Sequence, residues 1–442
     1  MEIVQPTVVG KLYQLFQASV CLIPVVGWGI ALAKNRTDQL RIAKLADQLA
    51  RSRLEAMGET VSERPVRQAR KVQRKITRGL PNGSEKAYAM RVNAEGLAAF
   101  REYGRLVGKL PKQKDQYTLK EVGDTLAHTF NASPACRQDN FFYGMVWCLT
   151  HPLKLLTHIQ GMGIFNNPVT GYNPYENGNV TTTGWSYQVG RNIPFYFGPG
   201  PGIKSDRTFD AYMEKMQGEQ RVHLQHCLEN PLGRGEKERR LEIGQFQETY
   251  GDHFRLYATP MNGPAWEMKG EFLKWDKPEE FIEKYKAFAL KDLDILDKST
   301  GFYLGKDVMT EAQFVACFDK AKAFAQLPNA YQPDKKTLGK GLQVLVQALI
   351  SLQALENLPE EAVFAQACKE DIDRGVVSNI AVRLLVMAKN GESITQESLE
   401  ELVGVCFGRA DLVSQKRIVQ DKFEALLAFT YLLSGVQAMN LW

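Results

Sequence analysis

The stretch Ala362-Val-Phe-Ala-Gln-Ala-Cys-Lys-Glu-Asp-Ile-Asp-Arg-Gly375 decides how the second half of this chain is expected to fold. It opens with a short, mostly apolar run that is typical of a buried strand, and a strongly acidic segment follows. From Gly375 to Ala388 apolar side chains recur at helical spacing, which predicts a helix anchored to a core. The stretch therefore predicts a strand, a short loop and a helix.

A second reading of the same region stays open. Leu358-Pro-Glu-Glu-Ala362 has proline at a first helical position and acids in a first turn, which are features of a helix start. If residues 359–370 were helical, the loop would not exist.

Cys368 and Arg374 are separated by five residues, and this spacing suits hydrolysis of a phosphate monoester. Such chemistry needs a thiolate nucleophile and a cup of backbone N–H groups around the phosphate oxygens. A guanidinium can grip two of those oxygens, and the N-terminus of a following helix adds positive potential. The loop between Cys368 and Arg374 is therefore the candidate catalytic loop of the chain.

The residues Cys368-Lys-Glu-Asp-Ile-Asp-Arg-Gly375 resemble signature loops of the phosphoinositide and inositol-phosphate branches of the cysteine phosphatases. Myotubularin-type and Sac-type enzymes carry an acid two places after the cysteine and an aspartate directly before the arginine, as do Glu370 and Asp373 here. Secreted bacterial inositol-phosphate phosphatases begin this loop with Cys-Lys and end it with Asp-Arg. The chain is also faintly similar to uncharacterised proteins of chlamydia-like intracellular bacteria.

The resemblance covers only this loop, and it departs from the family at two points. Gly375 replaces the threonine that usually follows the arginine, and the usual small residues and glycine are missing from Lys369-Glu-Asp371. Three acids in the loop repel phosphate, so slow turnover and a non-catalytic relic are both compatible with it.

The resemblance implies a role for each residue that matches. Cys368 would be the nucleophile and Arg374 the oxyanion clamp, while Asp373 would be the general acid. Lys369 and Gly375 would contact the substrate. Asp276 in Trp275-Asp-Lys-Pro278 is a second candidate for the general acid. The implied activity is that of a phosphoric monoester hydrolase with a phosphocysteine intermediate, which needs no cofactor and no metal ion, and the implied substrate is a phosphoinositide or an inositol phosphate.

The N-terminal part of the chain differs in composition from the rest. No charged residue occurs in the 22 residues between Lys11 and Lys34, which is enough to span a bilayer. A buried helical hairpin bent at Pro24–Gly27 and a cleaved signal peptide are the alternatives. Between positions 34 and 78 there are 13 Lys or Arg residues against 5 Asp or Glu. Six of the basic residues share one helical face that would contact anionic lipid headgroups: Arg67, Arg70, Lys71, Arg74, Lys75 and Arg78.

We expect an α+β fold that is predominantly helical, with three regions. Residues 1–35 form the uncharged, membrane-contacting segment, 36–125 a basic helical region, and 126–442 a domain resembling a cysteine phosphatase, with a helical C-terminus. Within the last region, Thr181–Val189 and Phe254–Thr259 are strand candidates, whereas Leu224–Leu228 reads as part of a helix. Helical periodicity covers 278–297, 310–326, 337–356, 376–389, 395–405 and 411–434.

Composition limits the remaining choices. The 442 residues are 44% hydrophobic and 24% charged, as in folded proteins, and the net charge is +5. Seven scattered cysteines without a Cys-x-x-Cys pair indicate reduced thiols rather than disulfides or zinc. The thiols therefore favour a reducing compartment, and the N-terminal features favour a membrane surface. The resemblance to secreted bacterial phosphatases implies the alternative, secretion into a host cell as a bacterial effector. Few aromatic residues interleave the basic face, so nucleic acid is not a predicted partner.

Two other functions remain open. A thiol protease or deubiquitinase would use another cysteine, and His226-Cys227 followed by Arg234 is superficially similar to the phosphatase pattern but has one residue too many. A membrane-associated effector or scaffold without enzymatic activity would use the N-terminal features alone.

Overall fold

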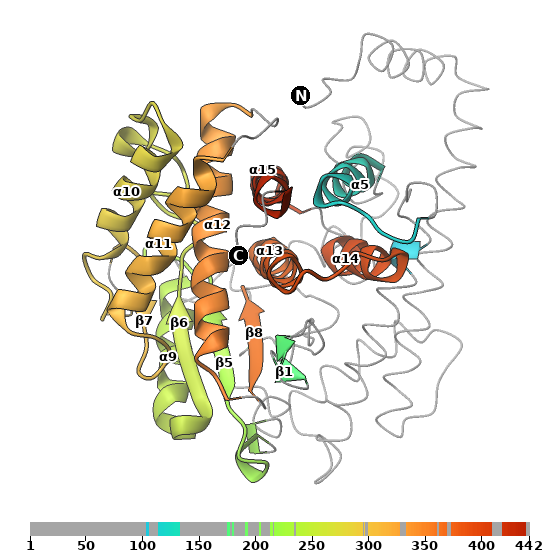
Figure 1. The fold of residues 1–442 in the computed structure, drawn as a ribbon. Coiled ribbons are helices and arrows are strands. Elements are labelled where there is room, and N and C mark those ends of the chain that lie inside the picture. Colours follow the sequence, from blue (N-terminus) through green and yellow to red (C-terminus); the bar gives the residue numbers. More distant parts are fainter. Residues whose placement is uncertain are drawn as a thin grey trace, which may run out of the picture.

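The computed structural model describes most of the chain from residue 213 onward. The described residues are 103–105, 114–132, 175–176, 179–180, 191–192, 203–204, 213–214, 216–233, 236–294, 296, 299–327, 333–359, 362–368, 373–408 and 418–438. In these residues the fold is mixed α and β and mostly helical, as the sequence predicts (Figure 1). The uncharged segment, the six-residue basic face and the strand candidate Thr181–Val189 lie outside the described residues, so all three stay predictions.

A four-stranded sheet lies at the centre of the described region, in the order β7-β6-β5-β8. The strands are β5 (His223–Cys227), β6 (Phe254–Ala258), β7 (Tyr303–Leu304) and β8 (Val363–Ala367). Strand β5 is parallel to both β6 and β8, while β7 runs antiparallel to β6. Two further two-stranded sheets pair β1 (Tyr175–Glu176) with β2 (Asn179–Val180), and β3 (Arg191–Asn192) with β4 (Ile203–Lys204).

The two faces of the central sheet pack against different helices. Because side chains alternate along a strand, Leu256 and Cys227 face α9 (Glu236–Tyr250), whereas Tyr257 and Phe364 face the larger helical core. Parallel strands need long crossovers, and α9 supplies the one between β5 and β6. The crossover from β6 to β8 contains β7 and three helices: α10 (Pro278–Ala289), α11 (Glu311–Ala325) and α12 (Lys335–Glu356).

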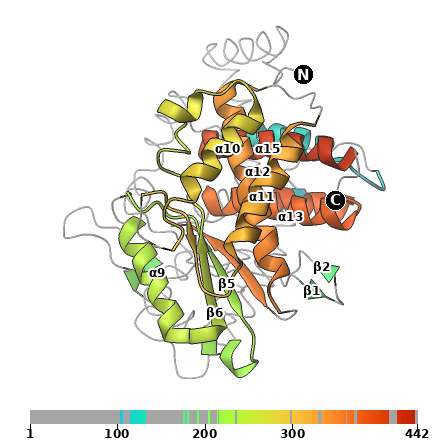
Figure 2. The same ribbon diagram turned by 60° about the vertical axis from the view of Figure 1, so that its left-hand side comes forward.

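Helix α12 is the central helix of the core. It packs against α10, α11, α13 (Arg374–Asn390) and α15 (Gln420–Ala438), so it is buried almost all round (Figures 1 and 2). Gly341 allows α12 to approach α15, because a Cβ there would lie 2.6 Å from the Ala428 Cβ. Among the described residues α12 alone is long and apolar enough to cross a membrane, yet 89% of its apolar window is buried in the fold. Its hydrophobicity is therefore explained by its place in the core.

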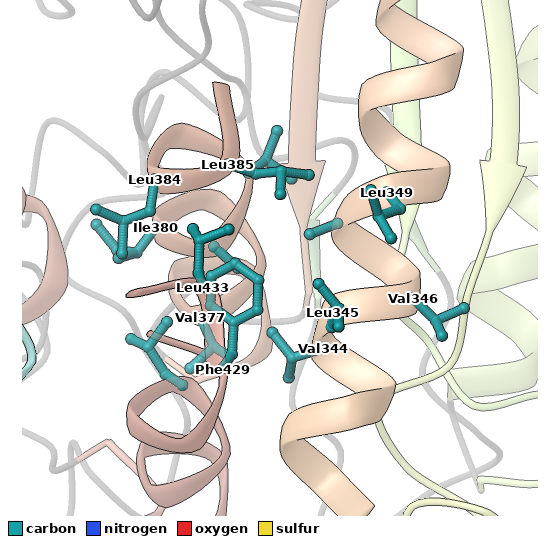
Figure 3. Close-up of a cluster of buried hydrophobic side chains, with 14 of the residues drawn as sticks. Val344, Leu345, Val346, Leu349, Val377, Ile380, Leu384, Leu385, Phe429 and Leu433 are labelled. Atoms are coloured by element: carbon teal, nitrogen blue, oxygen red, sulfur yellow. The ribbon is translucent and has the colours of Figure 1, made fainter. Parts of the chain in front are cut away.

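The core between α12, α13 and α15 is built from branched aliphatic and aromatic side chains (Figure 3). Val344 and Leu345 of α12 face Val377 of α13 and Phe429 of α15 in one cluster, and all four are almost fully buried. Burying each such side chain stabilises the fold by about 1.5–3 kcal/mol. This cluster holds α13 in place and thereby places its first residue, Arg374.

Two further helices, one from before the sheet in the sequence and one from after it, pack beside α13 and α15. Helices α5 (Leu119–Ala132) and α14 (Gln396–Gly408) pack together, and α5 also contacts α15. An isolated bridge between Tyr117 and Ile394 joins the segments that precede them. Helix α5 spans the expected boundary between residues 125 and 126.

Most expected elements of the C-terminal half are present in the structure, although the helix expected over 278–297 ends at Ala289. Strand β6 matches the candidate at Phe254–Thr259, and β8 matches the apolar run before Cys368. The helix start at Pro359 is wrong, because α12 ends at Glu356 and residues 363–367 pair with β5 instead. The helix expected over 411–434 is described as α15, Gln420–Ala438.

The helical reading of Leu224–Leu228 is also wrong. These residues belong to β5, the strand with parallel partners on both sides. Three of the five side chains of β5 are polar, so its sequence lacks the apolar pattern that predicts a buried strand. They are buried because His223 Nε2 lies 3.1 Å from Gln225 Oε1, and His226 stacks on Tyr257 with ring centres 4.4 Å apart.

Candidate functional site

The candidate catalytic loop joins a buried strand to a buried helix. Cys368 directly follows β8, and Arg374 is the first residue of α13. Both side chains are buried, each residue being 7% exposed. In sheets with parallel strands, ligands bind outside the carboxyl ends of the strands, and the junction between β8 and α13 lies at that edge. The strand before Cys368 and the helix that begins at Arg374 agree with the sequence prediction, while residues 369–372 between them lie outside the described residues.

Arg374 is held by groups that follow the end of β5. Its Nη1 donates to the Leu228 carbonyl at 3.0 Å and to Glu236 Oε2 at 2.7 Å. Its Nη2 donates to Glu229 Oε2 at 3.3 Å. These contacts fix the N-terminus of α13 against the carboxyl end of β5 and against the first residue of α9.

The electrostatics of this cluster follow from burial and from the paired charges. Burial alone would lower the pKa of the guanidinium, but the charges of Glu229, Cys368 and Glu236 raise it above its usual value. Burial would raise the pKa of Glu236, but the charge and hydrogen bonds of Arg374, with further hydrogen bonds from Glu229 and the Asn230 backbone, lower it to about 2. Arg374 is therefore a permanent cation that two carboxyl groups already contact.

Within the part of the chain that the structure describes, one edge of the Arg374 guanidinium has no hydrogen-bond partner. Its hydrogen bonds to Leu228, Glu229 and Glu236 all come from the two Nη atoms. Among the described residues no acceptor contacts the Nε–H. A guanidinium has five N–H donors, so Nε and the second proton of Nη2 can still bind an oxyanion.

Asp373 occupies the N-cap position of α13 but makes no capping hydrogen bond with its side chain. Its Oδ1 instead accepts from the Val419 backbone N–H at 2.8 Å. The candidate general acid is thus tied to the segment that enters α15. This contact brings the segment before α15 next to the N-terminus of α13.

A group of buried polar side chains lies near the carboxyl ends of β5, β6 and β8. His226 Nε2 lies 2.6 Å from Thr259 Oγ1, and its Nδ1 lies 3.4 Å from Ser378 Oγ. Burial lowers the pKa of His226 to about 3, so the ring is neutral. Gln366 pairs in register with His226, is 1% exposed, and neither amide atom has a hydrogen-bond partner. It lies two residues before Cys368, hence on the same face of β8.

Of the other residues that the sequence predicts for the site, only Gly375 is described beside Arg374. Gly375 is buried in the first turn of α13, beside Arg374. Lys369, Glu370 and Asp371 lie outside the described residues. Asp276 is exposed before α10, where its backbone N–H donates to Glu280 Oε2 at 2.9 Å, and no described contact joins it to Cys368 or Arg374.

The neighbouring pair His226-Cys227 does not form a thiol–imidazole couple. Successive residues of β5 point to opposite faces, so Cys227 faces α9 while His226 stacks between Tyr257 and Phe364. Burial raises the pKa of the Cys227 thiol, and burial raises that of Cys317 to about 12. Neither thiol has the thiolate character that a nucleophile needs.

Sequence reasoning missed Glu229 and Glu236. The segment Leu228-Glu-Asn-Pro-Leu-Gly-Arg-Gly-Glu236 carries an acid directly after β5 and another at the start of α9. Reading 223–227 as a strand would have drawn attention to both, since polar residues that follow parallel strands meet at one edge. Within the described residues, no group of three or more His, Cys, Asp or Glu side chains is arranged to hold a metal ion.

Comparison with protein-family models, with curated proteins and with solved structures finds no match for the chain. A function can therefore be inferred only from the sequence and from the geometry around Cys368 and Arg374.

Proposed function

We propose that this chain is a cysteine-dependent phosphatase that acts on phosphoinositides or inositol phosphates. The single observation that supports the proposal most is the placement of Cys368 at the end of a buried parallel strand and of Arg374 at the start of a 17-residue helix. Five residues between a strand and a helix can wrap their backbone N–H groups around a phosphate, and the dipole of α13 favours an anion there.

The proposed reaction has two steps. The Cys368 thiolate attacks phosphorus, the bond to the leaving oxygen breaks, and Asp373 donates a proton to that oxygen. A water molecule then loses a proton to Asp373 and attacks the phosphocysteine, which releases inorganic phosphate and restores the thiolate. In both steps the free edge of Arg374 would hold two of the phosphate oxygens.

Glu229 and Glu236 are part of the proposal. They hold Arg374 through its Nη atoms, so the guanidinium is oriented before the substrate arrives. The same carboxylates repel a phosphate dianion, and this favours substrates that bring further contacts of their own. The basic face of residues 67–78 would bring the chain to an anionic membrane, and secretion as a bacterial effector belongs to the same proposal.

The test is phosphate release by the purified full-length chain, with a short-chain phosphoinositide, an inositol phosphate and a chromogenic phosphate ester as substrates. We expect Cys368→Ser to remove activity and Asp373→Asn to lower it by about 10²–10⁴-fold. Cys317→Ser is the matched control, because Cys317 is also buried and a hydroxyl keeps its hydrogen bond to the Gln313 carbonyl. Activity that survives in Cys368→Ser would reject this loop as the catalytic site. No activity in the parent would favour the non-enzymatic membrane-associated effector.

Flotation with liposomes tests the membrane contact. Binding to anionic vesicles should be lost when residues 1–80 are removed, and equal flotation of the full and shortened chains would contradict it.

A further inference from the structure

Two lysines and a tryptophan form a second basic cluster close to the candidate loop. The Nζ of Lys422 lies 3.7 Å from the centre of the Trp266 ring, and the Nζ of Lys340 lies 5.5 Å from it. Both ammonium groups approach the same carboxylate oxygen, Asp421 Oδ2, at 3.8 and 2.7 Å. Trp266 Nε1 donates to that oxygen at 3.0 Å. The two lysines are therefore neighbours that share one carboxylate.

Both lysine side chains are buried far more deeply than is usual. That of Lys340 is 7% exposed and that of Lys422 is 6% exposed, while Asp421 is 38% exposed. Lysines are almost never fully buried unless they are paired. Among the described residues Asp421 is the one carboxylate within ion-pair distance of the two ammonium groups, while Asp373 and Glu267 act on Lys422 from farther away. Direct contacts therefore give the two buried ammonium groups one counter-charge between them.

The hydrogen-bonding capacity of the two lysines is also only partly used. Lys340 Nζ donates to Asp421, and Lys422 Nζ donates to the Met261 carbonyl. The described residues offer them no further hydrogen bond. Each ammonium has three donors, so the cluster keeps several N–H groups for an anion.

The position of the cluster links it to the candidate loop. Asp421 and Lys422 lie in the first turn of α15, whose dipole also favours an anion. Val419, just before that turn, donates to Asp373. The charges of Asp373 and Arg374 act on Lys422, together with those of Asp421 and Lys340. Burial, with Arg374 and Lys340, lowers the pKa of Lys422 well below its usual value, and a bound anion would reverse this effect.

We propose that Lys340, Lys422 and Trp266 form a second anion subsite, which binds a further phosphate group of the substrate. The inference rests on the proposed phosphatase function and narrows its substrates to compact molecules with two or more phosphates. The phosphate that is cleaved lies against Arg374, and the neighbouring one replaces the missing negative charge between the two lysines. Such a substrate is a soluble inositol polyphosphate or the headgroup of a multiply phosphorylated phosphoinositide.

The experiment measures binding to the full-length Cys368→Ser protein by titration calorimetry. The probes are inositol hexakisphosphate, a short-chain phosphatidylinositol bisphosphate below its micelle concentration, and inorganic phosphate. Lys340→Met and Lys422→Met should each weaken binding of the polyphosphates by about tenfold or more, and weaken inorganic phosphate less. Lys340→Arg should retain most of the affinity. The relative affinity of the first two probes tells the soluble ligand from the lipid headgroup.

Lys335→Met is the matched control. Lys335 also lies on α12 and contacts a tryptophan ring, with its Nζ 4.9 Å from the centre of Trp275, but it is exposed and outside the cluster. Its replacement should change the affinity less than about twofold. Thermal melting shows whether each variant is folded. Unchanged polyphosphate affinity in both folded lysine variants, or no binding to the parent, would overturn the subsite. Because the binding arm does not need turnover, this outcome is distinct from a failure of the phosphatase assay.

Discussion

Arg374 and the pair Lys340 and Lys422 are two neighbouring buried basic groups, and their positive charges are neutralised differently. Arg374 contacts two carboxylates and a carbonyl, whereas Lys340 and Lys422 share one carboxylate. A buried cation with surplus carboxylates is held in position by the protein itself. A buried cluster with too few carboxylates lacks part of its counter-charge, and a ligand can supply it. Charge balance thus separates Arg374, which the protein positions, from the lysine pair that we propose as a binding group.

Of the changes considered, replacing Arg374 should reduce the free energy of unfolding the most. Arg374→Met leaves Glu229 and Glu236 buried without their cation, so we expect a loss of about 3–5 kcal/mol in the free energy of unfolding. Urea denaturation followed by circular dichroism measures it. Adding Glu229→Gln and Glu236→Gln to the same protein should restore part of the loss. Arg255→Met, at a partly exposed guanidinium, is the control, and an equal loss there would contradict the pairing.

The second-largest effect on stability is expected when acid protonates Glu236, which contacts Arg374. Because the pKa of Glu236 is about 2 in the folded chain against 4.5 for a free side chain, its stabilisation is complete above pH 4.5 and is lost as the pH falls toward 2. The shift corresponds to a stabilisation on the order of 3 kcal/mol, at 1.36 kcal/mol per pKa unit. Unfolding measured from pH 6 to 2.5 should be less pH-dependent in Glu236→Gln. The exposed Glu311→Gln should leave the profile unchanged, and a flat profile in the parent would exclude the low pKa.

The smallest effect is expected at the lysine pair. Lys422→Met removes an incompletely neutralised buried charge, so its unfolding free energy at pH 7 should stay within about 1 kcal/mol of the parent or exceed it. The lowered pKa of Lys422 makes the parent more stable as the pH rises toward 10.5, since the unfolded chain binds the proton more readily. This dependence should weaken in the variant. A loss as large as that of Arg374→Met would mean that Lys422 is a structural ion pair, not part of a binding site.

How far the fold could be predicted depended on what each segment buries. The apolar run of β8 and the periodic helices α10 to α15 were predictable, because their side chains meet a core with the period of their own backbone. Strand β5 was not, since its histidines and glutamine are buried through mutual contacts that no local pattern reveals. The Pro359 signal was misleading because pairing with β5 outweighs a local preference for helix.

The sequence predicted only those residues of the candidate site that lie close to one another along the chain. Cys368, Asp373 and Arg374 are close in sequence, and their spacing alone pointed to them. Glu229 and Glu236 reach Arg374 only through the sheet, and Lys340 meets Lys422 only where α12 crosses α15. These contacts cannot be predicted from a single sequence, because they depend on how segments that are distant along the chain pack together.

The bond between Arg374 and Glu236 joins residues 138 positions apart, and this has a consequence for folding kinetics. Parallel pairing of β5 with β8 closes a long loop whose entropy is lost before its contacts form, so such steps are slow. We therefore expect Arg374 to meet Glu229 and Glu236 only after β8 has paired with β5, so a chain still emerging from the ribosome would hold this arginine without its carboxylates.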